Sequence, residues 1–406
     1  MAMNLPIEFE EYTRELFGEE RYGCFLASFS EEQPVSVRLN PYKPIEPPTA
    51  EAQPIAWCRN AYYLAERPDF TLDPLFHAGC YYVQEAGSMF IDEVIRQLDF
   101  KAATALDLCA APGGKSTLLR AALSDDCQLY CNEPDHRRAN ILMENLQKQG
   151  HPKVTVTNNY AKDYQKAKLL FDLVLADVPC SGEGMFRKDE GAIKEWSIQN
   201  VMKCQALQRS IISDIWPCIK ENGILIYSTC TFNTRENEEN VRWICEELGA
   251  DIIPITTKKE WNISGSLLKG FDATVYRFIP GTTKTEGLFI CVMRKKSHEM
   301  VSGKTNLKIL RILSNGHYEG QVKGKDTIPA HAESLLINLS TDKYPKAELD
   351  LATALRYLRR ETIVLPVETP RGYVVVTYKG KNLGFVKNLG NRANNLYPQE
   401  WKIRFK

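Results

Sequence analysis

Short apolar runs alternate with amphipathic helical patterns between residues 103 and 229, and this alternation restricts the fold more than any other feature. The runs predict strands at 103–109, 127–133, 153–158, 171–177 and 223–229. Helical patterns lie at 114–123, 135–150 and 198–220, the last interrupted or kinked near Pro217. Since these strands are apolar throughout rather than at every second residue, helices should cover both of their faces. The sequence therefore predicts a Rossmann-like α/β domain with a mostly parallel sheet.

Further segments flank this domain on both sides. The first part, to about residue 95, contains a helical pattern, a strand-like run and a Pro-rich loop, at 6–17, 35–40 and 41–48. We therefore expect an N-terminal α+β extension. After the last parallel strand, runs at 274–280 and 287–295 should form an antiparallel pair at the edge of the sheet.

The C-terminal part differs in charge from the rest of the chain. A polar stretch without periodicity at 295–306 is typical of a linker, and the remainder is β-rich with one helix near 347–360. From Arg294 to the end there are 21 Lys or Arg and 10 Asp or Glu, out of 51 of each in the chain. A basic tail suggests a polyanionic partner, although an ordinary basic surface would give the same count. We expect three parts, at 1–95, 96–295 and 306–406.

Composition excludes several classes of protein. The 406 residues suffice for two or three domains with a large core. No run approaches the roughly 18–20 apolar residues of a membrane span, and the first residues lack the pattern of a signal peptide. The twelve cysteines include no CxxC pair, which argues against a zinc ribbon and against a disulfide framework. We expect a cytoplasmic protein that uses no metal, contacts no membrane and acts as a monomer.

A turn of small residues, LDLCAAPGGKSTLL at 106–119, joins the first predicted strand to its helix. Small residues let a ligand approach the backbone, and the helix N-terminus offers free N–H groups. The turn is not a P-loop, because Cys109 stands where that motif requires glycine, and the GxGxxG dinucleotide fingerprint is absent. S-adenosylmethionine would need an acid at the end of the next strand for its ribose, and Glu133 lies there. The alternative is a turn that serves only tight packing.

Two cysteines follow apolar runs, Cys180 in DVPCSG and Cys230 in IYSTCTFN. A thiolate is an intrinsically reactive nucleophile, whereas most cysteines of a chain like this are expected to be small core residues. In an enzyme that uses S-adenosylmethionine, a thiolate has a specific use. Carbon 5 of a pyrimidine is too poor a nucleophile to take a methyl group until a thiolate has added to carbon 6. One cysteine can form this adduct while the other helps to release it.

Three motifs, in this order and on successive predicted strand ends, identify a family. LDLCAAPGGK, DVPCSGEGMFRKD and YSTCTFNTRENEENV together resemble the Sun-family RNA cytosine-5 methyltransferases. The similarity spans most of residues 30–295 and includes VSVRLNPYK and YYVQEAGSM. The basic extension ending in NLGFVKNLGNRANNLYP looks like the tail of the bacterial small-subunit ribosomal RNA members. The resemblance implies a class I methyltransferase fold, S-adenosyl-L-methionine as cofactor, an RNA-binding extension at 1–95 and a PUA-like RNA-binding region at 306–406.

The resemblance also implies roles for individual residues. Cys230 would be the nucleophile, Cys180 would assist product release, and Asp177 would contact the target cytosine beside the cofactor. Lys115 would point toward the active site, and Glu133 would hold the ribose. The methionine portion of the cofactor would be wrapped by Cys109, Ala110, Ala111, Pro112, Gly113, Gly114 and Lys115.

Other positions keep two interpretations each. Arg138, one helical turn beyond Glu133, would either face the cofactor pocket or lie on a helix surface. Arg38 and Asn40 would either contact RNA or occupy a solvated strand edge. Such enzymes commonly place an acid beside the adenine, but the aligned residue here is Tyr160. Backbone groups or stacking on that ring would then have to recognise the base.

Substrate and chemistry also keep alternatives. RNA of the small ribosomal subunit is the expected partner, with transfer RNA as the runner-up, and a paired cytosine would have to be flipped out to meet the thiol. In a DNA cytosine-5 methyltransferase, Cys180 would act alone and Cys230 would be a core residue. A third interpretation is an RNA-binding assembly factor without catalytic activity.

Overall fold

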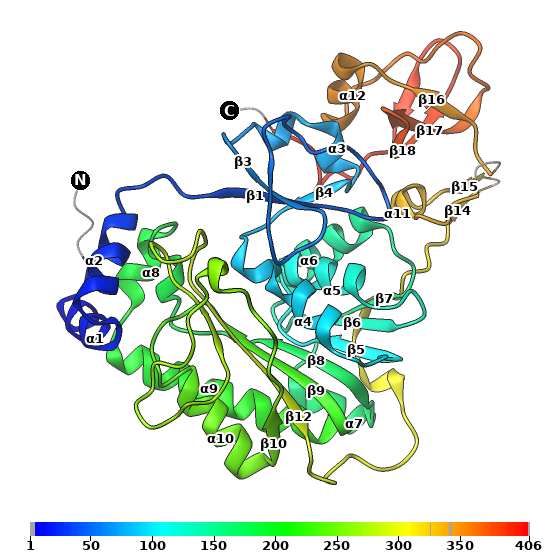
Figure 1. The fold of residues 1–406 in the computed structure, drawn as a ribbon. Helices are drawn as coiled ribbons and strands as arrows, with labels where there is room; N and C mark the ends of the chain where they lie inside the picture. The colour runs from blue at the N-terminus through cyan, green and yellow to red at the C-terminus, as the bar shows by residue number, and fades with distance from the viewer. Residues whose placement is uncertain (1–4, 325, 341–342, 405–406) are drawn as a thin grey trace.

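A mixed sheet forms the centre of the protein in the computed structural model, which describes residues 5–324, 326–340 and 343–404 (Figure 1). Its parallel strands are β5 (Thr104–Asp107), β6 (Gln128–Asn132), β7 (Val154–Thr157), β8 (Phe171–Asp177) and β9 (Ile219–Thr229). Its antiparallel strands are β10 (Ala250–Ile252), β11 (Tyr276–Phe278), β12 (Leu288–Lys295) and β13 (Ile312–Ser314). The order is β10-β12-β9-β8-β5-β6-β7-β13, and β11 also pairs with β12.

Helices cover both faces of this sheet, as the apolar strands predict (Figure 1). One face carries α4 (Ile91–Gln97), α5 (Gly114–Ala122) and α6 (His136–Gln149). The other carries α7 (Ala161–Ala167), α9 (Ile198–Ile215) and α10 (Glu238–Leu248). Neighbouring residues of one strand point to opposite layers, so Ala105 is buried in the first apolar core and Leu106 in the second. The predicted α/β fold with a mostly parallel sheet is confirmed.

Capping and helix-breaking residues end the helices at the positions that the sequence predicts. The Asp135 side chain accepts a hydrogen bond from the N–H of Arg138 at 2.9 Å and so caps α6. Gly150 ends the same helix in the left-handed conformation, with φ of 84°. The helical pattern at 198–220 is interrupted as predicted, because α9 ends at Ile215 and a short 3₁₀ turn containing Pro217 follows.

The N-terminal part begins with a helical hairpin, α1 (Ile7–Phe17) and α2 (Glu19–Ser28). Its apolar face packs on the central domain rather than on the rest of the N-terminal part. The ring of Phe9 lies 4.9 Å from that of Phe186, and the ring of Phe25 lies 5.3 Å from that of Phe232. The hairpin therefore covers two loops of the central domain, and its apolar residues share one core with them.

The rest of the N-terminal part is an antiparallel sheet of order β2-β3-β1-β4, with one short helix, α3 (Pro74–His77). The strands are β1 (Val35–Leu39), β2 (Gln53–Pro54), β3 (Ala61–Leu64) and β4 (Tyr81–Val83). Val37 and Leu39 of this sheet share one apolar core with Tyr357 and Leu358 from the C-terminal part. The predicted α+β extension is confirmed, and its sheet lies between the central domain and the C-terminal part (Figure 1).

The C-terminal part is rich in strands, as predicted. Its main sheet has the order β16 (Lys346–Glu348), β17 (Gly372–Tyr378), β18 (Lys381–Asn388) and β19 (Ala393–Asn395). A small hairpin joins β14 (Gln321–Lys323) to β15 (Asp326–Ile328), and the helices are α11 (His331–Leu335) and α12 (Leu351–Leu358). The helix expected near 347–360 corresponds to α12. No helix of the described residues is both long and apolar enough to cross a membrane.

The two edges of the central sheet differ from the sequence prediction. The runs at 274–280 and 287–295 do pair antiparallel, as β11 and β12, but β12 lies inside the sheet, because β9 pairs with one side of it and β10 and β11 pair with the other. At the opposite edge, β13 pairs with β7. From residue 296 to residue 306 the segment expected to be a linker has no helix or strand, yet it runs from the end of β12 to the opposite edge of the sheet and leads into this extra strand.

Candidate active site

The carboxyl ends of the parallel strands bring the predicted site residues to one edge of the sheet. Asp107 ends β5, Glu133 follows β6, Asp177 ends β8 and Cys230 follows β9. In open α/β sheets, ligands bind at this edge. The fold therefore places side chains from four separate segments around one region.

The two predicted thiols lie side by side. The Sγ atoms of Cys180 and Cys230 are 3.2 Å apart, and the N–H of Cys230 donates to the Sγ of Cys180 at 3.3 Å. The hydrogen bond with Cys230, together with burial, raises the pKa of Cys180 well above its ordinary value. Cys180 therefore keeps its proton at neutral pH, whereas an attacking thiol must lose its own. The arrangement gives one firmly protonated thiol in contact with a second thiol.

An ion pair lies between the small-residue turn and the strand that leads to Cys180. The Nζ of Lys115 is 2.9 Å from Oδ2 of Asp177, and the hydroxyl of Ser228 donates to Oδ1 at 2.7 Å. Burial is the largest single influence and lowers the pKa of Lys115, but the charge and hydrogen bond of Asp177 together with the charges of Cys230 and Glu85 outweigh it, so the net shift is upward. Asp177 and Ser228 are paired across β8 and β9, so the sheet register sets this contact. Lys115 is thus a cation, and both oxygens of Asp177 are held in place.

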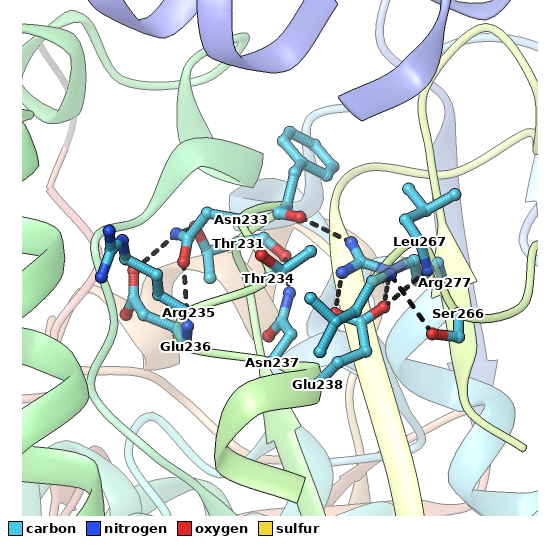
Figure 2. A network of polar contacts seen from close by, with 12 residues as sticks. Thr231, Asn233, Thr234, Arg235, Glu236, Asn237, Glu238, Ser266, Leu267 and Arg277 are labelled. Atoms are coloured by element: carbon cyan, nitrogen blue, oxygen red, sulfur yellow. Dashed lines mark hydrogen bonds and ion pairs between the residues drawn. The ribbon is translucent and has the colours of Figure 1, made fainter. Parts of the chain in front are cut away.

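Glu236 joins the two loops that carry the thiols, at 180–186 and 230–237. Its carboxylate accepts hydrogen bonds from the N–H of Ser181 at 3.0 Å and from the amide of Asn233 at 2.8 Å, the second of which Figure 2 shows. Burial raises the pKa of Glu236 to about 7. Because a buried carboxylate needs such donors, Glu236 fixes the first thiol loop against its own loop.

Glu183 makes the reciprocal connection from the first loop to the second. Its Oε2 accepts from the N–H groups of Phe232 and Asn233 at 2.7 and 2.9 Å, and its Oε1 accepts from the indole of Trp196 at 2.9 Å. Glu183 is 1% exposed. Each loop therefore supplies a buried acid to the backbone of the other, and this cross-connection sets the distance between the thiols.

A buried ion pair lies beside the second loop and supports it (Figure 2). Arg277 on β11 pairs with Glu238 at the start of α10, and both side chains are almost completely buried. A second guanidinium nitrogen, Nη1, donates to the carbonyl of Phe232 at 2.6 Å. Glu238 also accepts the N–H of Leu267 at 2.9 Å. Strand β11, which the sequence placed at the edge of the sheet, thus anchors the loop of Cys230.

The small-residue turn has the shape expected of a binding loop. Gly113 adopts φ of 115°, a conformation that favours glycine, and α5 begins at the next residue without a side-chain cap. The guanidinium of Arg138 donates to the carbonyl of Ala111 at 2.9 Å, and the amide of Asn145 donates to the carbonyl of Pro112 at 2.8 Å. Side chains of α6 therefore hold the turn from behind, and the first N–H groups of α5 remain available to a ligand.

Two buried acids beside this turn fit a polar ligand such as S-adenosyl-L-methionine. Glu133 is 2% exposed, and its Oε1 accepts the N–H of Asp135 at 3.0 Å. Asp107 is fully buried, its Oδ2 accepts the hydroxyl of Ser116 at 2.6 Å, and its Oδ1 has no hydrogen-bond partner. Burial raises the pKa of Asp107 to about 7. An orphaned buried oxygen at a strand end is a place where a ligand donor is expected.

The structure shows the surroundings of Arg138 and Tyr160, for which the sequence left two interpretations each. Arg138 contacts the carbonyl of Ala111 and lies 3.6 Å from Oε2 of Glu133, so it joins the turn and the acid rather than lying free on the helix. Tyr160 precedes α7 and is 66% exposed, and its N–H donates to Oδ2 of Asp163 at 3.1 Å. No acid therefore occupies the slot that the resemblance assigns to one.

Arg38 and Asn40 correct the sequence analysis, because neither lies on a solvated strand edge and neither offers a surface to RNA. Arg38 is 3% exposed, and its Nη2 donates to the hydroxyl of Thr117 at 2.7 Å. The amide of Asn40 is also buried and donates to the carbonyls of Gly79 and Gln149 at 2.8 and 3.0 Å. Both residues tie the N-terminal sheet to the helices of the central domain.

The sequence analysis missed several residues of this site. Glu183 and Glu236 lie within the quoted motifs, but a single sequence does not distinguish a buried acid from a surface one. Asp107 and Ser228 also lie within these motifs, and their location at strand ends was the signal that could have found them. Across the described ranges, no group of three or more His, Cys, Asp or Glu side chains is arranged to hold a metal ion.

Known structures share this architecture. The protein is similar to the crystal structure of PH0851, with a TM-score of 0.64 and 23% identity over 72% of this chain and 66% of that one. It is also similar to a methyltransferase homologue from Pyrococcus horikoshii, with a TM-score of 0.61 and 25% identity over 72% of this chain and 96% of that one. The fold is that of the class I methyltransferases, with the candidate site at the carboxyl ends of the parallel strands.

Family models then place the chain more narrowly. The model of 16S rRNA methyltransferase RsmB/F matches residues 98–294, that of the N-terminal domain of 16S rRNA methyltransferase RsmF matches 5–86, and that of the RsmF PUA domain matches 344–403. The central part of the chain thus matches the RsmB/F methyltransferase model, and its two flanking parts match the N-terminal and PUA domains of RsmF. The family resemblance predicted from the three sequence motifs is confirmed.

Curated relatives agree with this placement. Ribosomal RNA small subunit methyltransferase F of Pectobacterium carotovorum is 29% identical over 306 residues, which are 72% of this chain and 63% of that protein. The protein of the same name from an Enterobacter species is 26% identical over 476 aligned positions, covering 98% of this chain and 97% of its own. The first of these matches spans less than two thirds of its relative.

Proposed function

We propose that this protein transfers a methyl group from S-adenosyl-L-methionine to carbon 5 of cytosine in RNA, through a covalent bond between Cys230 and the base. The observation that carries the proposal is the contact between the Sγ atoms of Cys180 and Cys230, 3.2 Å apart at the ends of neighbouring strands. A core cysteine needs no such partner, and a single nucleophile would need no second thiol.

The residues present fit the cofactor. The turn from Cys109 to Lys115 would wrap its methionine portion, and Glu133 would accept hydrogen bonds from its ribose, with Arg138 holding both elements. Asp107 adds an unpaired oxygen beside the same turn. When bound, S-adenosyl-L-methionine supplies an electrophilic methyl group.

The chain's own residues would act on the base in sequence. Cys230, as the thiolate, forms a bond to carbon 6 and makes carbon 5 nucleophilic. Asp177, held at both oxygens by Lys115 and Ser228, contacts and orients the cytosine. After methyl transfer, water takes the proton from carbon 5, the electrons of that bond re-form the double bond between carbons 5 and 6, and the Cys230 sulfur leaves as a thiolate that can receive a proton from Cys180. Cys180 is placed beside that sulfur to assist this release.

We propose small-subunit ribosomal RNA as the substrate. The curated relatives are named for it, and the basic C-terminal part matches a PUA domain. The target cytosine would be flipped out of its helix to reach Cys230. The protein would then work in the cytoplasm, as a monomer, with no metal.

Bisulfite sequencing of ribosomal and transfer RNA, from cells with and without the gene, tests this function. We expect one or more cytosines of the small-subunit RNA to resist conversion only when the gene is present. A change confined to transfer RNA would move the substrate to that class. If no cytosine changes in either RNA, methyl transfer is excluded and an RNA-binding assembly role takes its place.

Glu133→Ala should weaken binding of S-adenosyl-L-methionine by about 10- to 100-fold, because hydrogen bonds to a charged acceptor contribute about 1.5–3 kcal/mol. Isothermal titration calorimetry measures the change. Glu247→Ala, which removes an exposed acid of α10, is the matched control and should bind as the wild type does. A wild-type Kd for Glu133→Ala would contradict the assignment of the ribose site.

A further inference from the structure

The segment between the central and C-terminal parts is bound along its length to the central domain. We call residues 301–314 the strap. The N–H of Val301 donates to the carbonyl of Pro217 at 2.9 Å, and the N–H of Asn306 donates to that of Ala167 at 2.9 Å. The strap then forms β13 alongside β7, on the side of the sheet away from β12 (Figure 1). It therefore passes beside the carboxyl end of β7.

One strap residue, Arg311, contacts the two asparagines that follow β7. The N–H of Asn158 donates to the carbonyl of Arg311 at 2.9 Å. The N–H of Arg311 donates to Oδ1 of Asn159 at 3.0 Å, and Nδ2 of Asn159 donates back to the Arg311 carbonyl at 3.2 Å. All three bonds use the backbone of Arg311, whereas its side chain is exposed. The contact is therefore independent of the residue's charge.

The first asparagine holds the acid proposed for the ribose. The amide of Asn158 donates to the carbonyls of Glu133 and Pro134 at 2.8 and 2.9 Å. The N–H of Glu133 in turn donates to the carbonyl of Thr157 at 3.1 Å. The backbone at Glu133 is thus held by residues at the end of β7, the strand with which the strap pairs.

The second asparagine holds the small-residue turn through Asn132. The N–H of Asn159 donates to Oδ1 of Asn132 at 3.0 Å. Nδ2 of Asn132 donates to the carbonyls of Asn159 and Leu108 at 2.8 and 3.1 Å, and its own carbonyl accepts the N–H of Ala110 at 2.8 Å. Asn132 and Asn159 are 1% and 7% exposed, so water does not replace these bonds when one is lost.

We propose that the strap is part of the cofactor site, with the backbone of Arg311 positioning both the small-residue turn and Glu133 through Asn159 and Asn158. The identity of the ligand rests on the proposed function. At the position where the family resemblance predicts an acid beside the adenine, this chain has Tyr160. The residue before it, Asn159, makes hydrogen bonds to the strap. Arg311 and Asn159 are positioning residues, since neither has to touch the cofactor.

Two substitutions in the full-length protein remove parts of this connection. Arg311→Pro deletes the N–H that donates to Asn159 and leaves the carbonyl in place. Leu310 has φ of −82° and ψ of 137°, a conformation that is compatible with a following proline. Asn159→Ala removes both side-chain bonds to Arg311 and keeps its backbone bonds to Asn132. Arg311→Ala is the matched control, because it removes only an exposed side chain.

Calorimetric titration with S-adenosyl-L-homocysteine should give a Kd that is about 3- to 10-fold higher for Arg311→Pro and Asn159→Ala, the effect of losing one or two net hydrogen bonds. Arg311→Ala should bind as the wild type does. In methylation assays the KM for the cofactor should rise by the same factor, while kcat at saturating cofactor stays within about twofold of wild type. A purely structural role would instead lower the unfolding temperature and leave Kd unchanged.

The outcomes separate this inference from the proposed function. If the wild-type protein binds S-adenosyl-L-homocysteine and both variants bind it equally well, the strap has no part in the site and the inference is overturned. If the wild type does not bind it at all, the proposed function fails, and the inference fails with it. Should Arg311→Pro not fold, as circular dichroism would show, Asn159→Ala decides alone.

Discussion

Cys230→Ala should abolish methyl transfer to RNA, reducing the rate by more than about 10⁴-fold, the scale on which removing a covalent nucleophile acts. Without the Cys230 sulfur, carbon 6 receives no nucleophile, so carbon 5 never becomes able to attack a methyl group. Transfer of tritiated methyl groups to small-subunit RNA measures the loss. No RNA adduct should be visible after denaturing electrophoresis either, because the bond forms at this sulfur.

Cofactor binding and a second cysteine serve as controls for that result. Cys230→Ala should bind S-adenosyl-L-homocysteine with the wild-type Kd, since the thiol is assigned to the base and not to the cofactor. Cys245→Ala removes a half-buried thiol that lies on α10, outside the candidate site, and this variant should methylate RNA normally. If Cys230→Ala is as active as Cys245→Ala, Cys230 is a core residue and the covalent mechanism is wrong.

Cys180→Ala should have the opposite signature and accumulate a covalent complex with RNA. Attack and methyl transfer need only Cys230, but release needs the neighbouring thiol, whose raised pKa keeps a proton beside the reacting sulfur. Multiple turnover should therefore fall by about 10²- to 10⁴-fold, the usual contribution of a proton-transfer group. A band that is shifted by the mass of the RNA and survives SDS measures the trapped complex.

The double variant Cys180→Ala/Cys230→Ala tests which sulfur carries the RNA. It should show no shifted band, because the adduct depends on Cys230. If Cys230→Ala traps RNA and Cys180→Ala does not, the roles are reversed, as in the DNA-type assignment. Normal methylation by both single variants would make the two thiols structural.

The central fold could be predicted from the sequence because its signals are local. The run at 103–109 contains Thr104–Asp107, and the run at 171–177 coincides with β8, since a strand buried on both faces is a continuous apolar stretch. The thiols were found for a related reason, as each follows such a stretch. Their contact at 3.2 Å depends on the pairing of β8 with β9, which no local pattern specifies.

The features that sequence reasoning missed depend on contacts between distant segments. β10 and β13 have three residues each, too few for a period to be recognised. Arg38 looked like a surface residue because charged side chains usually are, yet it is buried against Thr117, which lies far along the chain. A polar stretch without periodicity also gave no indication that the strap is bound to the central domain.

The charge boundary near residue 294 suggests a truncation there to separate RNA binding from cofactor binding. The strap argues against that design. A chain that ends before Arg311 would lose the backbone that holds Asn158 and Asn159, so weakened cofactor binding would not report on the C-terminal part alone. Substitutions on the C-terminal surface test its contribution to RNA binding without this complication.

Strand β13 also covers part of one edge of the central sheet. It pairs antiparallel with the outer side of β7 at Val156 and Thr157, and all four residues of β7, Val154–Thr157, are buried and β-branched. Without it, the unpaired N–H and C=O groups of β7 would form an open edge onto which another chain could add a strand. Fragments that stop short of residue 312 should therefore aggregate. A central domain that is cut at the apparent linker would then be inactive because it aggregates, although it keeps all of its candidate catalytic residues.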